Sequence, residues 1–176
     1  PFDAKEFKRW LLEIRSFTLL KASEWMRKLP ETCASAGVAV AIVREIPGAS
    51  LSGATRWVTK DKALIQLSLK YKTDDQFWFT FFHEAGHVLL HGKRQVFIED
   101  GNGNDSEEER EANAFAADML IPPEHAGELR HLRSKPQIRD FAARIGIAPG
   151  IVAGRLEHEF NAHGVYRDLK IKYQWK

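Results

Sequence analysis

The segment "QFWFTFFHEAGHVLLHG", residues 76–92, constrains the fold more than any other part of the chain. It is apolar nearly all round, which is typical of a buried helix, and Gly92 is suited to end that helix. The segment nevertheless contains His83, Glu84 and His87. Burying two imidazoles and a carboxylate costs free energy unless they are paired or bound to a metal ion. We therefore expect a buried polar site on this helix.

The spacing of these three residues matches that of a catalytic zinc site. Residues four apart lie on one face of an α-helix, so His83 and His87 can each direct a ring nitrogen at the same ion. Glu84 lies beside that pair and can reach a water molecule bound to the ion. Zinc lowers the pKa of its water toward about 7, and a carboxylate can accept the proton as hydroxide attacks a carbonyl. The alternative is a pair of core histidines bonded to backbone carbonyls, which the burial cost makes less favourable.

Three further histidines do not fit the spacing of a metal site. His91 continues the four-residue step, but Lys93 stands where the extended HExxHxxGxxH pattern would place a histidine. We expect His91 to lie at the helix end or to support a ligand from outside. His158 and His163 are five residues apart, so they lie about 140° from each other around a helix. We interpret both as surface residues.

A third protein ligand is needed, with one position left open for water. The segment "SEEEREANAFAADMLIP", residues 106–122, predicts a helix whose alanines permit close packing against the histidine helix. It contains four glutamates: Glu107, Glu108, Glu109 and Glu111. Each has an alternative role, because Ser106 and Glu109 have the spacing of a capping box and acidic residues favour helix N-termini. These arguments leave the choice between Glu108 and Glu109 open, with Glu111 in third place.

The remaining segments predict an α+β fold. Apolar periodicity predicts helices at about 3–17 and 22–36. Three segments rich in β-branched residues follow: "VAVAIVREI" (38–46), "ATRWVT" (54–59) and "ALIQLSL" (63–69). The turn residues between them predict a small antiparallel three-stranded sheet, and the chain after the histidine helix predicts further helices.

We predict one domain over residues 1–176. Within it we distinguish N-terminal helices (1–36), the sheet with the zinc-binding helices (37–132) and a C-terminal helical extension (133–176). Cys33 is the only cysteine, so no internal disulfide can form, and a reducing cytoplasm is expected. With 26 basic and 24 acidic residues, charge alone does not favour nucleic-acid binding. No stretch approaches the roughly twenty apolar residues of a membrane span.

The segments "FTFFHEAGHVLLHG" and "EREANAFAADMLIPPE" together resemble the ImmA/IrrE family of zinc metallo-endopeptidases. The resemblance covers about residues 53–124, with weaker similarity at "IAPGIVAGRL". It implies a zincin-like active helix and a bound Zn2+ ion. In this family the glutamate four residues before the asparagine is the third ligand, which here selects Glu109. The resemblance also implies that Asn113 supports the site by hydrogen bonding.

The resemblance further implies a function. It predicts a zinc-dependent endopeptidase with Glu84 as general base, acting on a protein partner such as a repressor or an antitoxin-like regulator. Family members often accompany a helix-turn-helix DNA-binding domain, so we expect DNA contact only through a domain upstream of this sequence, which lacks an initial methionine. The alternative is a non-hydrolytic zinc-binding sensor module of a helix-turn-helix transcription regulator. Glu84 favours the enzyme, since a purely structural zinc site needs no free carboxylate.

Two further expectations concern surfaces. The segment "IRDFAARIGIAPGIVAGRL", residues 138–156, has the outline of a helix-turn-helix, but the balanced charge favours a helical hairpin that packs on the core. In zinc peptidases of this layout a strand beside the active helix pairs with an extended substrate. We expect residues 64–69 to be that strand, with 54–59 as the second candidate. Pairing of 64–69 on both sides would exclude it.

Overall fold

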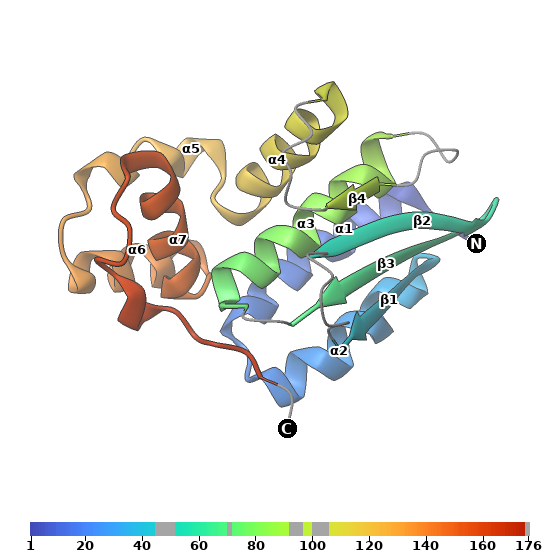
Figure 1. Cartoon of the computed structure of the whole chain (residues 1–176), viewed down its shortest axis with the longest axis horizontal. Helices are drawn as coiled ribbons and strands as arrows, with labels where there is room; N and C mark the ends of the chain where they lie inside the picture. The colour runs from blue at the N-terminus through green and yellow to red at the C-terminus, as the bar shows by residue number, and fades with distance from the viewer. Residues whose placement is uncertain (45–51, 70–71, 92–96, 100–105, 175–176) are drawn as a thin grey trace.

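The computed structural model describes residues 1–44, 52–69, 72–91, 97–99 and 106–174 (Figure 1). The first elements are α1 (Ala4–Ile14), the 3-10 helix η1 (Arg15–Leu19), α2 (Ala22–Ser35), β1 (Val38–Val43), β2 (Gly53–Thr59), β3 (Lys62–Ser68) and α3 (Asp74–Leu90). They are followed by β4 (Phe97–Glu99), α4 (Glu107–Leu120), α5 (Pro123–Ala126), η2 (Leu129–His131), α6 (Lys135–Ile145), α7 (Pro149–Phe160) and η3 (Arg167–Leu169). The predicted α+β class, with helices at both ends of the chain, is confirmed.

The strands form one mixed sheet in the order β1-β3-β2-β4. β3 is parallel to β1 and antiparallel to β2, and β2 is antiparallel to β4. The predicted antiparallel three-stranded arrangement is therefore wrong, although its β2–β3 hairpin is present. Buried Ala63, Ile65 and Leu67 favour a central position for β3, where both of its edges find partners. Turn residues specify a tight hairpin between neighbouring strands, whereas the longer connection before β2 leaves the partner of β1 to be decided by packing.

This strand order also decides which strand has a free edge for an extended substrate. Residues Ala63–Leu67 of β3 pair with β1 on one side and with β2 on the other, so this strand has no free edge for a peptide. The first candidate is therefore wrong. The second candidate, β2, is paired with β4 over Gly53–Thr55. In the described sheet, β4 is the outermost strand on that side (Figure 1).

Helix α3 runs through the centre of the molecule (Figure 1). Aromatic side chains anchor its N-terminal half. Trp25 of α2 lies against Phe77, with ring centroids 4.5 Å apart, and against Trp78, at 5.3 Å. The Trp78 indole donates a hydrogen bond to the Tyr173 hydroxyl at 3.0 Å. All four side chains are buried. Aromatic burial of this extent fixes the helix, and with it the orientation of the histidines farther along.

Small residues let α4 approach α3 closely. Ala112 and Ala116 are fully buried. A Cβ atom at Gly86 would lie 3.2 Å from Phe115 Cδ1 and 3.3 Å from Ala112 Cα. The predicted close contact between the alanine-rich helix and the histidine helix is confirmed.

The C-terminal helices pack on the core as a hairpin. Gly146, with φ of 79°, ends α6 in the left-handed conformation that favours glycine. Helix α7 then lies against the start of α3, where a Cβ at Gly150 would be 2.4 Å from the Asp74 carboxylate oxygens. This packing agrees with the interpretation of residues 138–156 as a core-packed hairpin. His158 and His163 are exposed, as expected.

Asp74 is buried at that contact. Its Oδ1 accepts hydrogen bonds from the backbone nitrogens of Asp75 at 3.1 Å and Ile171 at 3.0 Å. Burial, together with the negative charge of Asp75, raises the pKa of the Asp74 carboxyl to about 6. The folded protein therefore holds the Asp74 proton more tightly than the unfolded chain does.

This shift predicts a pH-dependent effect of Asp74→Asn. The wild-type protein should lose stability as the pH rises from about 4 to about 6, because the buried carboxyl must ionise. The variant has no such proton, so its unfolding free energy relative to wild type should rise by about 2–3 kcal/mol between pH 4 and pH 7. Urea unfolding across this range measures the difference. Asp140→Asn, at an exposed site of α6, is the control, and a pH-independent difference for Asp74→Asn would contradict the prediction.

Candidate metal centre

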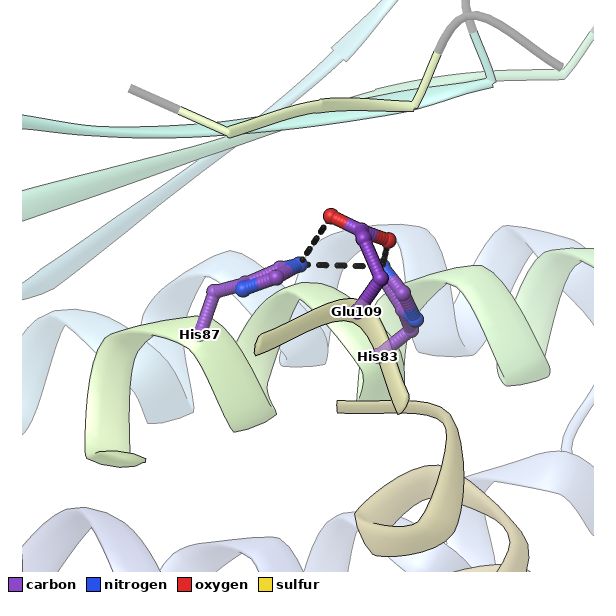
Figure 2. A group of neighbouring side chains, drawn as sticks. All are labelled: His83, His87 and Glu109. Carbon is purple, nitrogen blue, oxygen red and sulfur yellow. Dashed lines mark hydrogen bonds and ion pairs between the residues drawn. The ribbon is translucent and has the colours of Figure 1, made fainter. Parts of the chain in front are cut away.

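Three side chains from two helices converge at one point (Figure 2). The Nε2 atoms of His83 and His87, on successive turns of α3, are 3.0 Å apart. Glu109, in the first turn of α4, places Oε2 3.1 Å from His83 Nε2 and Oε1 3.1 Å from His87 Nε2. The histidine side chains are 2% and 1% exposed and the glutamate is 17% exposed. The structure thus brings together the three residues expected to bind metal, and Glu109 is the glutamate at the histidines.

These residues fit a zinc ion. Zinc bonds to nitrogen at about 2.0–2.1 Å in tetrahedral geometry, which separates two ligand atoms by roughly 3.3 Å. The observed separations of 3.0 and 3.1 Å are close to that value. Two imidazole nitrogens and a carboxylate oxygen also form one of the donor sets found in catalytic zinc sites. These residues could therefore hold Zn2+.

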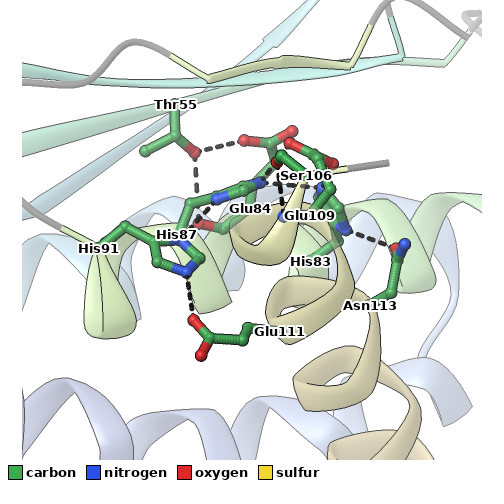
Figure 3. Close-up of polar contacts among 9 residues, drawn as sticks. All are labelled: Thr55, His83, Glu84, His87, His91, Ser106, Glu109, Glu111 and Asn113. Atoms are coloured by element: carbon green, nitrogen blue, oxygen red, sulfur yellow. Dashed lines mark hydrogen bonds and ion pairs between the residues drawn. The ribbon is translucent and has the colours of Figure 1, made fainter. Parts of the chain in front are cut away.

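The outer nitrogens of the two histidines have hydrogen-bond partners (Figure 3). His83 Nδ1 lies 2.8 Å from Asn113 Oδ1, and since a carbonyl oxygen only accepts, Nδ1 carries the hydrogen. His87 Nδ1 lies 2.8 Å from His91 Nδ1. In the tautomers that keep Nε2 unprotonated, two lone pairs face each other at 3.0 Å, an arrangement that a cation between them stabilises.

His91 extends this arrangement to a second carboxylate. Its Nε2 lies 3.0 Å from Glu111 Oε2 (Figure 3). If His87 Nδ1 donates to His91 Nδ1, the His91 hydrogen lies on Nε2 and is donated to Glu111. The expectation that His91 lies at the helix end, outside the ligand set, agrees with its position as the C-cap of α3. The role of Glu111 was not predicted, because it depends on how α4 faces the end of α3.

Glu84 is fully buried and its carboxylate lies between α3 and the sheet (Figure 3). The hydroxyl of Thr55, on β2, contacts the Glu84 carboxylate and also lies 3.2 Å from the Glu84 backbone oxygen. A Cβ at Gly53 would be 2.6 Å from Thr80 Cγ2 and 2.9 Å from Glu84 Oε1, so glycine allows β2 to approach here. Sequence reasoning missed Thr55, whose hydroxyl is ordinary in a strand until the strand is placed against Glu84.

The surroundings keep the site suited to cation binding. Burial, and to a lesser extent the neighbouring His83 and His91, lower the pKa of His87 to about 3. His87 therefore stays neutral, which is the form that binds a metal ion.

A family model for the IrrE N-terminal-like domain (Peptidase_M78) matches residues 43–157. The chain belongs to this family. The match includes β2, β3, all of α3 and α4, and most of α7, so it covers every residue of the metal centre. A search of curated proteins finds no match to the chain. The IrrE N-terminal-like family supports a function of the zinc metallopeptidase type.

None of the helices in the described parts of this IrrE N-terminal-like domain is both long enough and apolar enough to cross a membrane.

The two contacts of Glu109 allow its roles to be separated. Its backbone nitrogen donates to Ser106 Oγ at 3.2 Å, which caps α4, while its carboxylate faces the histidines. Glu109→Ala should greatly reduce zinc content after dialysis, because one of three ligands is lost. Ser106→Ala should cost about 1 kcal/mol of stability and leave the zinc content intact. Metal analysis with thermal unfolding checks both, and full zinc content in Glu109→Ala would exclude this ligand.

The His91–Glu111 contact predicts an effect on zinc affinity. His91→Ala removes the partner of His87 Nδ1 and should weaken zinc binding by about 10–100-fold, with a smaller loss in Glu111→Gln. Competition with a chromogenic chelator measures this affinity. Glu107→Gln changes an exposed residue of α4, the helix of Glu111, and should bind zinc with the wild-type affinity. Equal affinities for wild type and His91→Ala would show that the contact does not support the ligand.

Proposed function

We propose that this IrrE N-terminal-like domain is a zinc-dependent endopeptidase that hydrolyses a peptide bond in a protein partner. The observation that carries the proposal is the convergence of His83, His87 and Glu109 next to the buried carboxylate of Glu84. Two imidazole nitrogens and a carboxylate offer a donor set and geometry that suit Zn2+. A second carboxylate one residue from a ligand adds an acid–base group, which metal binding alone does not require.

In the proposed mechanism His83, His87 and Glu109 hold the ion. When bound, zinc supplies Lewis acidity that activates water and polarises the scissile carbonyl. Glu84 acts as general base, accepts a proton from the attacking water and returns it to the leaving amine. Asn113 fixes the His83 ring through the 2.8 Å contact to Nδ1.

Thr55 orients the general base in this proposal. Its hydroxyl contacts the Glu84 carboxylate and is itself 1% exposed, so it restricts that carboxylate from the sheet side. The strand β2 therefore contributes to the chemistry by positioning rather than by contact with the ion.

We also infer how a substrate approaches. Strand β4 is outermost on its side of the described sheet and passes near the three clustered side chains (Figure 2). An extended peptide can add to such an edge by backbone hydrogen bonds. We therefore propose that an extended substrate pairs with β4 rather than with β3 or β2.

The partner that we propose is a regulatory protein, a repressor or an antitoxin-like regulator, as the family resemblance implies. DNA contact would come only from a domain outside this sequence. The buried single cysteine, Cys33, supports a reducing, cytoplasmic setting. A non-hydrolytic sensor module remains the second candidate function, and the residue that separates the two candidates is Glu84.

Glu84→Gln tests the proposed function. The amide preserves shape but cannot accept the proton, so hydrolysis of the proposed repressor or antitoxin-like partner should fall at least about 100-fold while the protein stays folded and keeps its zinc. Gel analysis of cleavage, zinc content and circular dichroism measure the three properties. Cleavage by Glu84→Gln at the wild-type rate would exclude the general-base role. Absence of cleavage by zinc-loaded wild-type protein, with unchanged repressor binding in both proteins, would favour the sensor module.

A further inference from the structure

A pocket of about 580 Å³ lies between α3, α4 and α7. Such a volume falls within the roughly 300–1,000 Å³ of typical ligand sites. Its apolar lining comes from all three helices and from the residue after α4: Phe79, Ala114, Ala117, Leu120, Ile121 and Ile151. Figure 1 shows the three helices meeting at the end of α3 where the chain enters that helix. We call this cavity the interhelical pocket.

The interhelical pocket continues the helix faces that form the metal centre. On α3, Phe79 and Thr80 line it and stand one turn before His83. The Phe79 and His83 rings lie beside each other, with centroids 6.4 Å apart. Asn113 both lines the pocket and contacts His83 Nδ1. The pocket therefore lies next to the metal centre, on the same faces of α3 and α4.

The position of the pocket along α3 sets its register relative to the reacting bond. Phe79 and Gln76 precede His83 by four and seven residues, which corresponds to about 6 and 10 Å along the helix. An extended peptide advances about 3.3 Å per residue. A side chain in the pocket would thus belong to a residue two or three positions from the bond at the metal centre.

The charges around the pocket are paired within the protein. Arg155 forms an ion pair with Glu159 at 3.2 Å, both from α7. Asp75 pairs with Lys170 at 3.0 Å. Lys72, also at the rim, donates a hydrogen bond from Nζ to Ser52 Oγ at 2.7 Å. These rim groups therefore have partners within the protein, while the lining from α3, α4 and α7 is mainly apolar. This environment favours a neutral apolar side chain over a charged one, because a charged group would lose its hydration without a new partner.

We propose that the interhelical pocket binds a bulky apolar side chain of the peptide substrate, two or three residues from the scissile bond. The proposal rests on the peptidase function above and adds its specificity. It also gives the C-terminal hairpin a role, since α7 forms one wall. Gly154 lines that wall, and a Cβ there would lie 2.3 Å from Asp75 Oδ2, so the close approach of α7 to α3 depends on glycine.

The test uses variants that narrow the interhelical pocket and identifies the peptide bonds that each variant cleaves. Ala117→Phe and Ala114→Trp both add an aromatic ring from α4; Ala114 is exposed, so its variant places little demand on the core. Ala143→Phe, at an exposed site of α6, is the matched control. Each zinc-loaded protein is incubated with peptides from a digested proteome, and mass spectrometry identifies every cleaved bond. Zinc content and circular dichroism are measured in parallel.

Wild-type protein and Ala143→Phe should prefer Leu, Ile, Met or Phe at one position, two or three residues from the cleaved bond. Both pocket variants should lower kcat/KM about tenfold or more for those peptides and favour Gly or Ala there, with zinc retained. Identical cleavage profiles in wild type and both pocket variants would overturn the proposal. Loss of binding of an apolar dye with no change in the profile would instead indicate a site for a small apolar molecule, and also overturns it.

A binding measurement separates this proposal from the peptidase proposal. Immobilised, zinc-loaded Glu84→Gln is compared with Glu84→Gln/Ala117→Phe for retention of the same peptides. One outcome is that wild type cleaves no peptide while Glu84→Gln, but not Glu84→Gln/Ala117→Phe, retains apolar peptides. In that case the pocket assignment stands and the proposed peptidase activity is wrong. If no peptide is cleaved or retained, the pocket assignment falls as well.

Discussion

The structure depends on how an apolar helix accommodates polar groups in its interior. Helix α3 is anchored by aromatic rings at one end, yet it buries two histidines and a glutamate farther along. Desolvation makes this arrangement costly unless each group has a partner. Helix α4 supplies a partner for the histidines, the Glu109 carboxylate. On the sheet side, strand β2 supplies a partner for Glu84, the Thr55 hydroxyl. The arrangement of sheet and helices is thus tied to the electrostatics of three side chains.

Close backbone approach is what makes these partners available. Glycine at position 86 and alanine at 112 bring α4 onto α3, and Gly53 brings β2 toward Glu84. The interhelical pocket lies next to the candidate metal centre on α3 and α4, and α7 forms its third wall. Under the proposed function, these rigid elements would fix the distance between the metal centre and the pocket and so hold a peptide in register.

Much of the site could be predicted from local sequence, but the glutamate that serves as the third candidate ligand could not. His83, Glu84 and His87 share one helix, so their relation follows from the helical repeat. Whether Glu108 or Glu109 faces the histidines depends on how α4 is rotated about its axis. The local sequence does not determine that rotation, so both glutamates stayed candidate ligands. Family resemblance selected Glu109, and the structure places that carboxylate 3.1 Å from each histidine.

The sequence by itself determined the α+β class, the histidine helix and the position of its buried polar groups, because hydrophobic periodicity and helical spacing are local properties. Only the tertiary structure decided the strand order, the contacts of Thr55 and Glu111, and the packing of α7 on α3. Each of these depends on pairing between segments distant in the chain, where several registers satisfy the same local pattern. Burial of apolar side chains selects among these registers. It favours β3 in the centre of the sheet, where neighbouring strands occupy both of its edges.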